Sequence, residues 1–308
     1  MSKQQGQLWG IDLGGTKIEG VVMKSPEVAD SLFRDRIPTE AHKGYDHVIN
    51  QIALLVNQME QVLGYRPERI GIGTPGTMDP NTGLFKNSNS KSLNYKPLRQ
   101  DLQELLKMNV ITANDANCFA LAETRLGVVK EKFPKAEVVF GVIMGTGAGG
   151  GIVVHNKVIS GKQGIAGEWG HNFLDESGGS CYCGKTGCVE NIIAGPALER
   201  YYRNQSGTSR KLKEIVDLAN AKSDPVAIQT LDRLHEMFGK ALSVVINILD
   251  PDVIVIGGGV GNISSLYDKG IEHLKKYVFN DRLDTPVVRP SLGDSAGVFG
   301  AAFLTENL

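Results

Sequence analysis

One histidine and three cysteines lie close together in the sequence: His171, Cys181, Cys183 and Cys188. An imidazole and three thiolates are a common ligand set for tetrahedral Zn²⁺. The alternative is a disulfide, which is disfavoured because nothing in the sequence indicates export. The pattern predicts a zinc-binding loop. Because all four ligands come from the protein, the metal would be structural and would not activate water.

A second kind of chemistry is indicated by the residues from Asp12 to Lys17. Gly14 and Gly15 let the backbone come close to a phosphate, and Thr16 adds a hydroxyl donor. Lys17 supplies a positive charge, and Asp12 supplies a carboxylate that can hold hydrated Mg²⁺. The segment therefore predicts a phosphate-binding turn.

The run from Gly145 to Gly150 matches the dinucleotide-binding pattern G-x-G-x-x-G through Gly145, Thr146 and Gly147. That fingerprint requires a helix directly after the glycines, whereas residues 151–154 favour a strand. We interpret the run as a second phosphate turn. A hairpin whose glycines serve only the turn is equally compatible with this segment taken alone.

A third glycine run follows an apolar strand, at Gly257, Gly258 and Gly259. Together with the two turns it predicts one nucleotide bound between two domains. A helix can follow here, so a nucleotide-dependent oxidoreductase stays open as an alternative.

Asn114 and Asp115 stand between a predicted strand and a predicted helix. Open α/β sheets bind ligands at this edge, and there Asp115 could act as a general base that takes a proton from a substrate hydroxyl. Helix capping is the competing interpretation, since both residue types are favoured caps.

The elements that must position these residues alternate between strand and helix patterns, which predicts an α/β fold. Leu8–Leu13 and Ile18–Met23 form a predicted hairpin, and Val138–Met144 with residues 152–154 repeats it. The chain is therefore expected to consist of two related halves.

We expect an N-terminal domain over residues 1–122, joined by a returning C-terminal helix at about 295–308. The second domain would span residues 123–294 and carry the zinc-binding loop at 167–190.

Composition limits the classes of function. The 308 residues are 41% hydrophobic and 22% charged, as in a globular chain with a sizeable core. Lysine and arginine number 33 against 34 acidic residues, so no overall positive field favours nucleic acid or anionic lipid. No apolar run is long enough for a membrane span, and residues 1–5 do not resemble a signal peptide. We expect a cytoplasmic protein.

With these motifs in this order, the chain resembles the ROK family of bacterial sugar kinases over essentially its whole length. Its segments at residues 12–17, 73–76, 113–118, 145–150, 167–171 and 181–188 carry the resemblance, together with the glycines at 257–259. The resemblance implies a two-domain actin-like ATPase fold, related to ribonuclease H, with the active-site cleft between the domains. It also implies a homodimer.

The resemblance further implies phosphoryl transfer from ATP, with Mg²⁺, to the 6-hydroxyl of a hexose, and Asp115 as the base. It places Asn89, Asn114, Glu168, His171 and Glu190 on the sugar, and it assigns the zinc to the four residues named above.

Within the family the resemblance is strongest to the manno(fructo)kinase branch, through residues 86–89, 167–172 and 181–185. Fructose, mannose or glucose is therefore the expected acceptor. An N-acetylglucosamine or N-acetylmannosamine kinase is the alternative, because bacterial N-acetylglucosamine kinases share much of the same pattern. A tryptophan expected near Ser92 for a fructokinase is absent, so the sequence does not decide which hexose is bound. A sugar-sensing regulator is the alternative from another class. Such proteins carry an N-terminal helix-turn-helix, for which the residues before Asp12 leave no room.

Overall fold

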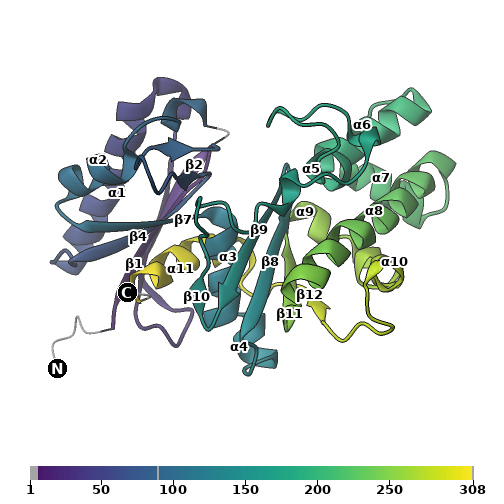
Figure 1. Cartoon of the computed structure of the whole chain (residues 1–308). Helices are drawn as coiled ribbons and strands as arrows, with labels where there is room; N and C mark the ends of the chain where they lie inside the picture. The colour runs from purple at the N-terminus through teal and green to yellow at the C-terminus, as the bar shows by residue number, and fades with distance from the viewer. Residues whose placement is uncertain (1–5, 89, 307–308) are drawn as a thin grey trace. The chain divides into compact units, whose positions relative to one another are not determined.

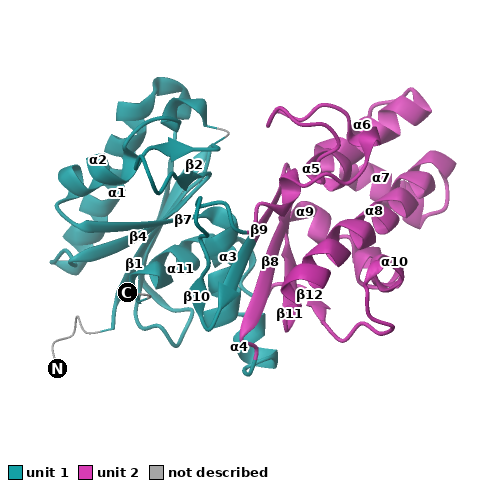
Figure 2. Cartoon of the chain, in the orientation of Figure 1, with its two compact units in different colours: residues 1–135, 151–166, 291–308 teal, residues 136–150, 167–290 magenta. Residues whose placement is uncertain are grey.

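A computed structural model describes residues 6–88 and 90–306. The chain divides into two compact units (Figure 2). Unit 1 comprises residues 1–135, 151–166 and 291–308, and unit 2 comprises residues 136–150 and 167–290. Residues 291–308, at the end of the chain, thus belong to the same unit as its beginning. Residues 123–135 also belong to this unit.

The sheet of unit 1 has five strands in the order β3-β2-β1-β4-β7. They are β1 (Leu8–Leu13), β2 (Lys17–Met23), β3 (Ser31–Pro38), β4 (Arg69–Thr74) and β7 (Asn109–Asn114). β1 pairs antiparallel with β2 across the predicted glycine turn, whereas β4 runs parallel to β1 and β7 parallel to β4. The carboxyl ends of β1, β4 and β7 therefore meet at one edge.

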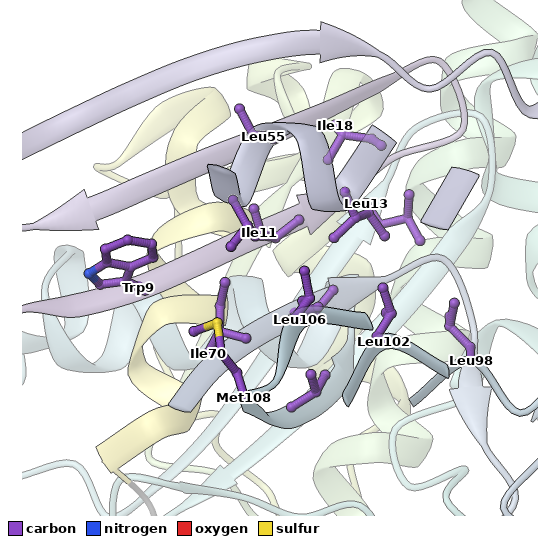
Figure 3. Close-up of a cluster of buried hydrophobic side chains, with 14 of the residues drawn as sticks. Trp9, Ile11, Leu13, Ile18, Leu55, Ile70, Leu98, Leu102, Leu106 and Met108 are labelled. Atoms are coloured by element: carbon purple, nitrogen blue, oxygen red, sulfur yellow. The ribbon is translucent and has the colours of Figure 1, made fainter. Parts of the chain in front are cut away.

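Alternation along β1 explains how the two faces of this sheet are covered. Trp9, Ile11 and Leu13 are buried in a core that also contains side chains of α1 (Tyr45–Leu63) and α2 (Leu98–Leu106) (Figure 3). Gly10 lies between these residues and faces the other way, where α11 (Ala296–Phe303) packs. A Cβ on Gly10 would lie 2.5 Å from the Ala302 nitrogen, so glycine is what lets this helix approach.

The remaining elements of unit 1 are short, apart from the helix after β7. They are η1 (Ala41–Lys43), β5 (Thr77–Met78), β6 (Phe85–Lys86), η2 (Lys91–Leu93), α3 (Asp115–Arg125), α4 (Val128–Lys132), η6 (Gly293–Ser295) and η7 (Leu304–Glu306).

A second five-stranded sheet has the order β10-β9-β8-β11-β12, and the boundary between the units passes through β9 after Gly150. Its strands are β8 (Val138–Met144), β9 (Ala148–Val154), β10 (Lys157–Val158), β11 (Val253–Gly257) and β12 (Val287–Val288). β11 runs parallel to both β8 and β12.

The helices of unit 2 lie between Trp169 and Tyr277 in the chain, and α5 to α10 are labelled in Figure 1. They are η3 (Trp169–His171), η4 (Glu176–Gly178), α5 (Glu190–Ile193), α6 (Gly195–Ser206), α7 (Leu212–Asn220), α8 (Pro225–Leu249), α9 (Gly258–Gly261), η5 (Ser264–Tyr267) and α10 (Lys269–Tyr277).

The two sheets have the same order when their strands are matched, β1 with β8 and β4 with β11. This confirms the expected α/β chain of two related halves. Among the described residues, no helix combines the length and apolar character that crossing a bilayer requires.

Candidate functional site

The first glycine turn joins β1 to β2 and is closed by its own backbone. The N–H of Gly14 donates to the carbonyl of Lys17 (3.0 Å), and the hydroxyl of Thr39 donates to the carbonyl of Gly14 (2.7 Å). A Cβ on Gly14 would lie 2.9 Å from the Lys17 carbonyl oxygen, so a larger residue would strain the turn. Gly15, Thr16 and Lys17 are exposed. The turn can therefore meet a phosphate from solvent.

Asp12 stands near the end of β1 with its carboxylate against the first turn of α11. Gly297 makes this contact feasible, since a Cβ there would lie 2.8 Å from Asp12 Oδ2. Burial, then the negative charges of Asp115 and Glu19, raise the pKa of Asp12 to about 7, although two nearby basic side chains oppose the shift. A bound divalent cation would favour the ionised carboxylate. Asp12 therefore suits Mg²⁺.

β7 ends at Asn114 and α3 begins at Asp115, as the sequence predicts within one residue. The Asn114 side chain accepts a hydrogen bond from the Asn117 N–H (2.8 Å), so Asn114 is the helix cap. Asp115 Oδ1 accepts from the Ala116 N–H (2.8 Å). Asp115 is exposed, yet desolvation by the surrounding protein raises the pKa of its carboxyl, against the opposing effect of backbone hydrogen bonds.

Glu19 lies beside this group and was not expected from the sequence. It is 3% exposed, pairs with Asp12 across β1 and β2, and contacts Arg34 Nε (2.7 Å) and Arg36 Nε (2.8 Å). The sequence of β2 offers a signal, since Glu19 is an acidic residue within the buried run from Ile18 to Met23. The two arginines compensate the charge of a carboxylate that is buried next to Asp12.

In unit 2, a strand follows the second glycine turn, as expected, and not a helix. The Gly145 N–H donates to the Gly147 carbonyl (2.9 Å) and closes the turn between β8 and β9. Glu190 braces the turn, because its Oε2 accepts from the Ala148 N–H (2.9 Å). A Cβ on Gly147 would lie only 2.6 Å from that oxygen. Thr146, at the tip, is exposed.

The third glycine run lies at the same edge of the second sheet. β11 ends at Gly257, opposite Ile143 of β8, and the short helix α9 begins at Gly258. Gly258 has a φ of +85°, and a Cβ there would lie 2.3 Å from the Met144 carbonyl oxygen. A Cβ on Gly145 would lie 3.9 Å from the Gly259 nitrogen. The structure thus brings the second and third runs together within unit 2.

A cavity of about 430 Å³ lies between α6 and the start of α7 in unit 2. It is lined by Pro196, Glu199, Arg200, Arg203, Ser209, Arg210, Lys211 and Glu214. Gly195, the first residue of α6, connects this wall to the second turn, since its N–H donates to the Gly145 carbonyl (2.8 Å). Sequence reasoning missed this cavity, because its residues carry no motif.

The predicted zinc ligands converge in unit 2. The ligand atoms of His171, Cys181, Cys183 and Cys188 all lie within 4.8 Å of one another. Cys183 Sγ is 3.6 Å from Cys188 Sγ, and Cys181 Sγ is 3.7 Å from His171 Nδ1. Two sulfurs bound to one tetrahedral zinc at about 2.3 Å would lie about 3.8 Å apart. The donor set and spacing therefore fit Zn²⁺, and the cysteines form no disulfide.

Glu168 precedes η3, and Trp169 fixes this segment to β9. The Trp169 indole donates to the Gly149 carbonyl (2.9 Å), and its ring packs edge-on against Phe140. Gly170 lies against the Ala148 carbonyl, where a Cβ would be 1.8 Å from the oxygen. Trp169 belongs to a segment that carries the resemblance, but the sequence indicates no role for it.

Asn89 lies outside the described residues. Its neighbours belong to an ordered loop, in which Asn94 Oδ1 accepts from the Ser88 N–H (3.0 Å) and Asn94 Nδ2 donates to the Ser88 carbonyl (2.9 Å). The sugar contacts expected for Asn89, Asn114, Glu168, His171 and Glu190 stay predictions, as do the nucleotide contacts of the glycine turns.

Comparison with known proteins covers nearly the whole chain. The model of the ROK family matches residues 8–307. An N-acetyl-D-glucosamine kinase from Aliivibrio salmonicida is 34% identical over 306 residues, which span 96% of this chain and 98% of the relative.

Two solved structures are also similar. The ROK hexokinase from Thermus thermophilus has a TM-score of 0.85 and 32% identity, covering 97% of both chains. A ROK family glucokinase from Streptomyces griseus, in complex with glucose and AMPPNP, has a TM-score of 0.77 and 28% identity, covering 97% of this chain and 99% of its own.

These matches confirm the two-domain actin-like ATPase fold that the resemblance implied. With a family model that spans residues 8–307, the chain belongs to the ROK family.

Proposed function

We propose that this chain is an ATP-dependent kinase that phosphorylates the 6-hydroxyl of a hexose or N-acetylhexosamine. The observation that carries the proposal is the neighbourhood of Asp12 and Asp115 beside the first glycine turn. A potential base, a potential Mg²⁺ ligand and a phosphate-binding turn are the parts that phosphoryl transfer requires. The similarity to an N-acetyl-D-glucosamine kinase and to two hexose kinases supports the same reaction.

In the reaction, Asp115 accepts the proton of the 6-hydroxyl as its oxygen attacks the γ-phosphorus. The oxygen–γ-phosphorus bond forms, the bond to the β-phosphate breaks, and ADP leaves. A carboxylate with a raised pKa holds this proton better than an ordinary one, which favours general-base catalysis near neutral pH. Asp12 would hold Mg²⁺, which when bound neutralises phosphate charge.

The donor nucleotide would use the glycine turns and the cavity between α6 and α7. The turns at Gly145 and Gly257 would hold phosphates with backbone N–H groups, and the nucleoside would extend from Gly145 past Gly195 into the cavity. The cavity is lined by four basic and two acidic side chains with Pro196 and Ser209, and these polar groups can hydrogen-bond a nucleoside. The support is local to unit 2, where Gly195 is hydrogen-bonded to the turn.

The acceptor sugar would be held by the segment that the zinc site stabilises. His171 would bind zinc through one imidazole nitrogen and a sugar hydroxyl through the other. Glu168 and Glu190 are attached to the two ends of the same loop and offer carboxylate acceptors. Zinc would be structural, because four protein ligands leave no open position.

The test is a coupled assay for ADP with ATP, Mg²⁺ and a panel of sugars. The panel contains fructose, mannose, glucose, N-acetylglucosamine and N-acetylmannosamine, and the phosphorylated carbon is identified by phosphorus NMR. We expect 6-phosphate products. The sugar with the highest kcat/KM decides between the simple hexoses and the N-acetylhexosamines. Turnover of none of the five, or phosphate on another hydroxyl, would contradict the proposal.

The homodimer expected from the resemblance is part of the same proposal. Sedimentation velocity of the purified chain measures the oligomeric state directly, and a mass near 33.3 kDa would contradict it.

A further inference from the structure

Tyr182 stands between Cys181 and Cys183 in the sequence and is hydrogen-bonded to His171. Its phenol oxygen lies 3.1 Å from His171 Nε2, and the two rings meet edge-on with centroids 5.2 Å apart. The tyrosine is nevertheless 66% exposed. An exposed side chain thus occupies one of the two imidazole nitrogens of a predicted metal ligand.

The position of the Cys181 thiol indicates which imidazole nitrogen of His171 would bind zinc. His171 Nδ1 faces Cys181 Sγ at 3.7 Å, so zinc would bind through Nδ1. A metal-bound neutral imidazole carries its proton on the other nitrogen. Nε2 then donates a hydrogen bond, and the phenol oxygen of Tyr182 accepts it. Nε2 has one proton and can make one strong hydrogen bond of this kind.

We propose that Tyr182 competes with the acceptor sugar for Nε2 of His171 and thereby lowers the affinity of the protein for the sugar. The inference rests on the proposed function, in which this nitrogen bonds a sugar hydroxyl. Because the two acceptors share one N–H, the tyrosine must leave when the sugar binds. Because the side chain is largely exposed, this movement costs little free energy, since water solvates the released hydroxyl.

The surroundings of the phenol support this role. Tyr182 stands between two of the predicted zinc ligands, and Glu168 and Glu190 stand at the two ends of the same loop. The phenol oxygen faces the imidazole nitrogen that we assign to the sugar, at 3.1 Å. Tyr182 therefore takes the hydrogen-bonding position on His171 that we assign to a sugar hydroxyl.

The experiment compares Tyr182→Phe with the wild-type holoenzyme. The substitution keeps the ring and removes the competing oxygen. One net hydrogen bond corresponds to about a twofold to tenfold change in affinity. We expect the sugar Kd, measured by calorimetry without nucleotide, and the sugar KM to fall by about this factor. The kcat should change less than twofold, and zinc content should remain one ion per chain.

Tyr277→Phe is the matched control, because it removes another phenol hydroxyl from unit 2, one bonded to Glu236. It should leave the sugar Kd unchanged. An unchanged or raised Kd in Tyr182→Phe would overturn the inference, and so would loss of zinc. Wild-type protein that phosphorylates no sugar of the panel would overturn both the proposed function and this inference. Turnover by the wild type with no gain of affinity in the variant overturns the inference alone.

Discussion

In unit 1 the glycine turn between β1 and β2 is surrounded by charged side chains, whereas the turn between β8 and β9 in unit 2 is held by backbone and one carboxylate. Asp12, Glu19 and Asp115 form an acidic group beside the first turn, and two arginines contact Glu19. Around the second turn, Glu190 receives an N–H and the glycines of α9 lie close. One strand arrangement thus supports two different environments.

The difference suggests a division of labour between the units. Carboxylates that lie close together repel one another, which raises their pKa values and favours the binding of a cation. Such a group suits proton transfer and metal binding. Backbone turns, a cavity and a loop with a metal-ligand set suit the binding and orientation of substrates. Variants of unit 1 should therefore change kcat, and variants of the unit 2 loop should change KM.

The largest expected effect comes from Asp115→Asn. The amide keeps the shape but cannot accept the proton, and general-base catalysis is typically worth about 10²–10⁴ in rate. We expect kcat to fall by about 10² or more, while the sugar Kd changes little. Steady-state kinetics and calorimetry measure both quantities. Asp46→Asn is the control, since Asp46 lies in the first turn of α1, and its kcat should stay within twofold of wild type. Near-normal turnover by Asp115→Asn would remove its assignment as the base.

The Asp12→Asn variant tests whether the negative charge of Asp12 destabilises the folded chain. The pKa of Asp12 is about 7 in the folded chain, against 3.8 as the ordinary value. Between these values the folded chain binds more protons than the unfolded chain, so the free energy of unfolding falls as pH rises from about 4 to 7. Removal of the charge should therefore stabilise the metal-free protein by up to about 4 kcal/mol at pH 8, and little at pH 4.

Urea unfolding at both pH values, without Mg²⁺, measures this difference. Asp35→Asn removes an exposed carboxylate from β3 and serves as the control. Equal stabilisation by Asp12→Asn at pH 4 and pH 8 would show that the charge of Asp12 is not the cause. The same variant should lose kinase activity, because Asp12 is the proposed Mg²⁺ ligand.

The parts of the fold that the sequence predicts well are those with local signals. Leu8–Leu13 and Val138–Met144 are strands with the predicted bounds, because continuous β-rich runs end at turn residues there. The cysteine cluster is also local, and its spacing alone indicates that the ligand atoms can meet.

The parts that escaped prediction depend on contacts between distant segments. Glu123 is fully buried and accepts hydrogen bonds from the N–H groups of Val128, Ser291 and Leu292, which tie the end of α3 to the final segment. No motif marks this residue. The cavity beside α6 and the bond between Tyr182 and His171 likewise follow from tertiary structure, so a sequence pattern could not reveal them.

The smallest of these three effects is expected for Cys183→Ser, which removes one predicted zinc ligand. The loop carries Glu168, His171 and Glu190 at or near its ends, and loss of the metal should let them move. Misplacement of binding groups by about 1 Å can cost up to 10²-fold. We expect the sugar KM to rise on the order of tenfold, with a smaller change in kcat, and zinc content to fall by elemental analysis.

Lys185→Gln is the control for this variant, because it changes an exposed side chain of the same loop and keeps all four ligands. Its KM and zinc content should match those of the wild type. A fall in kcat at constant KM in Cys183→Ser would contradict the division of labour, because it would connect the unit 2 loop with proton transfer at Asp115. A raised KM at unchanged kcat would instead separate substrate orientation in unit 2 from chemistry in unit 1.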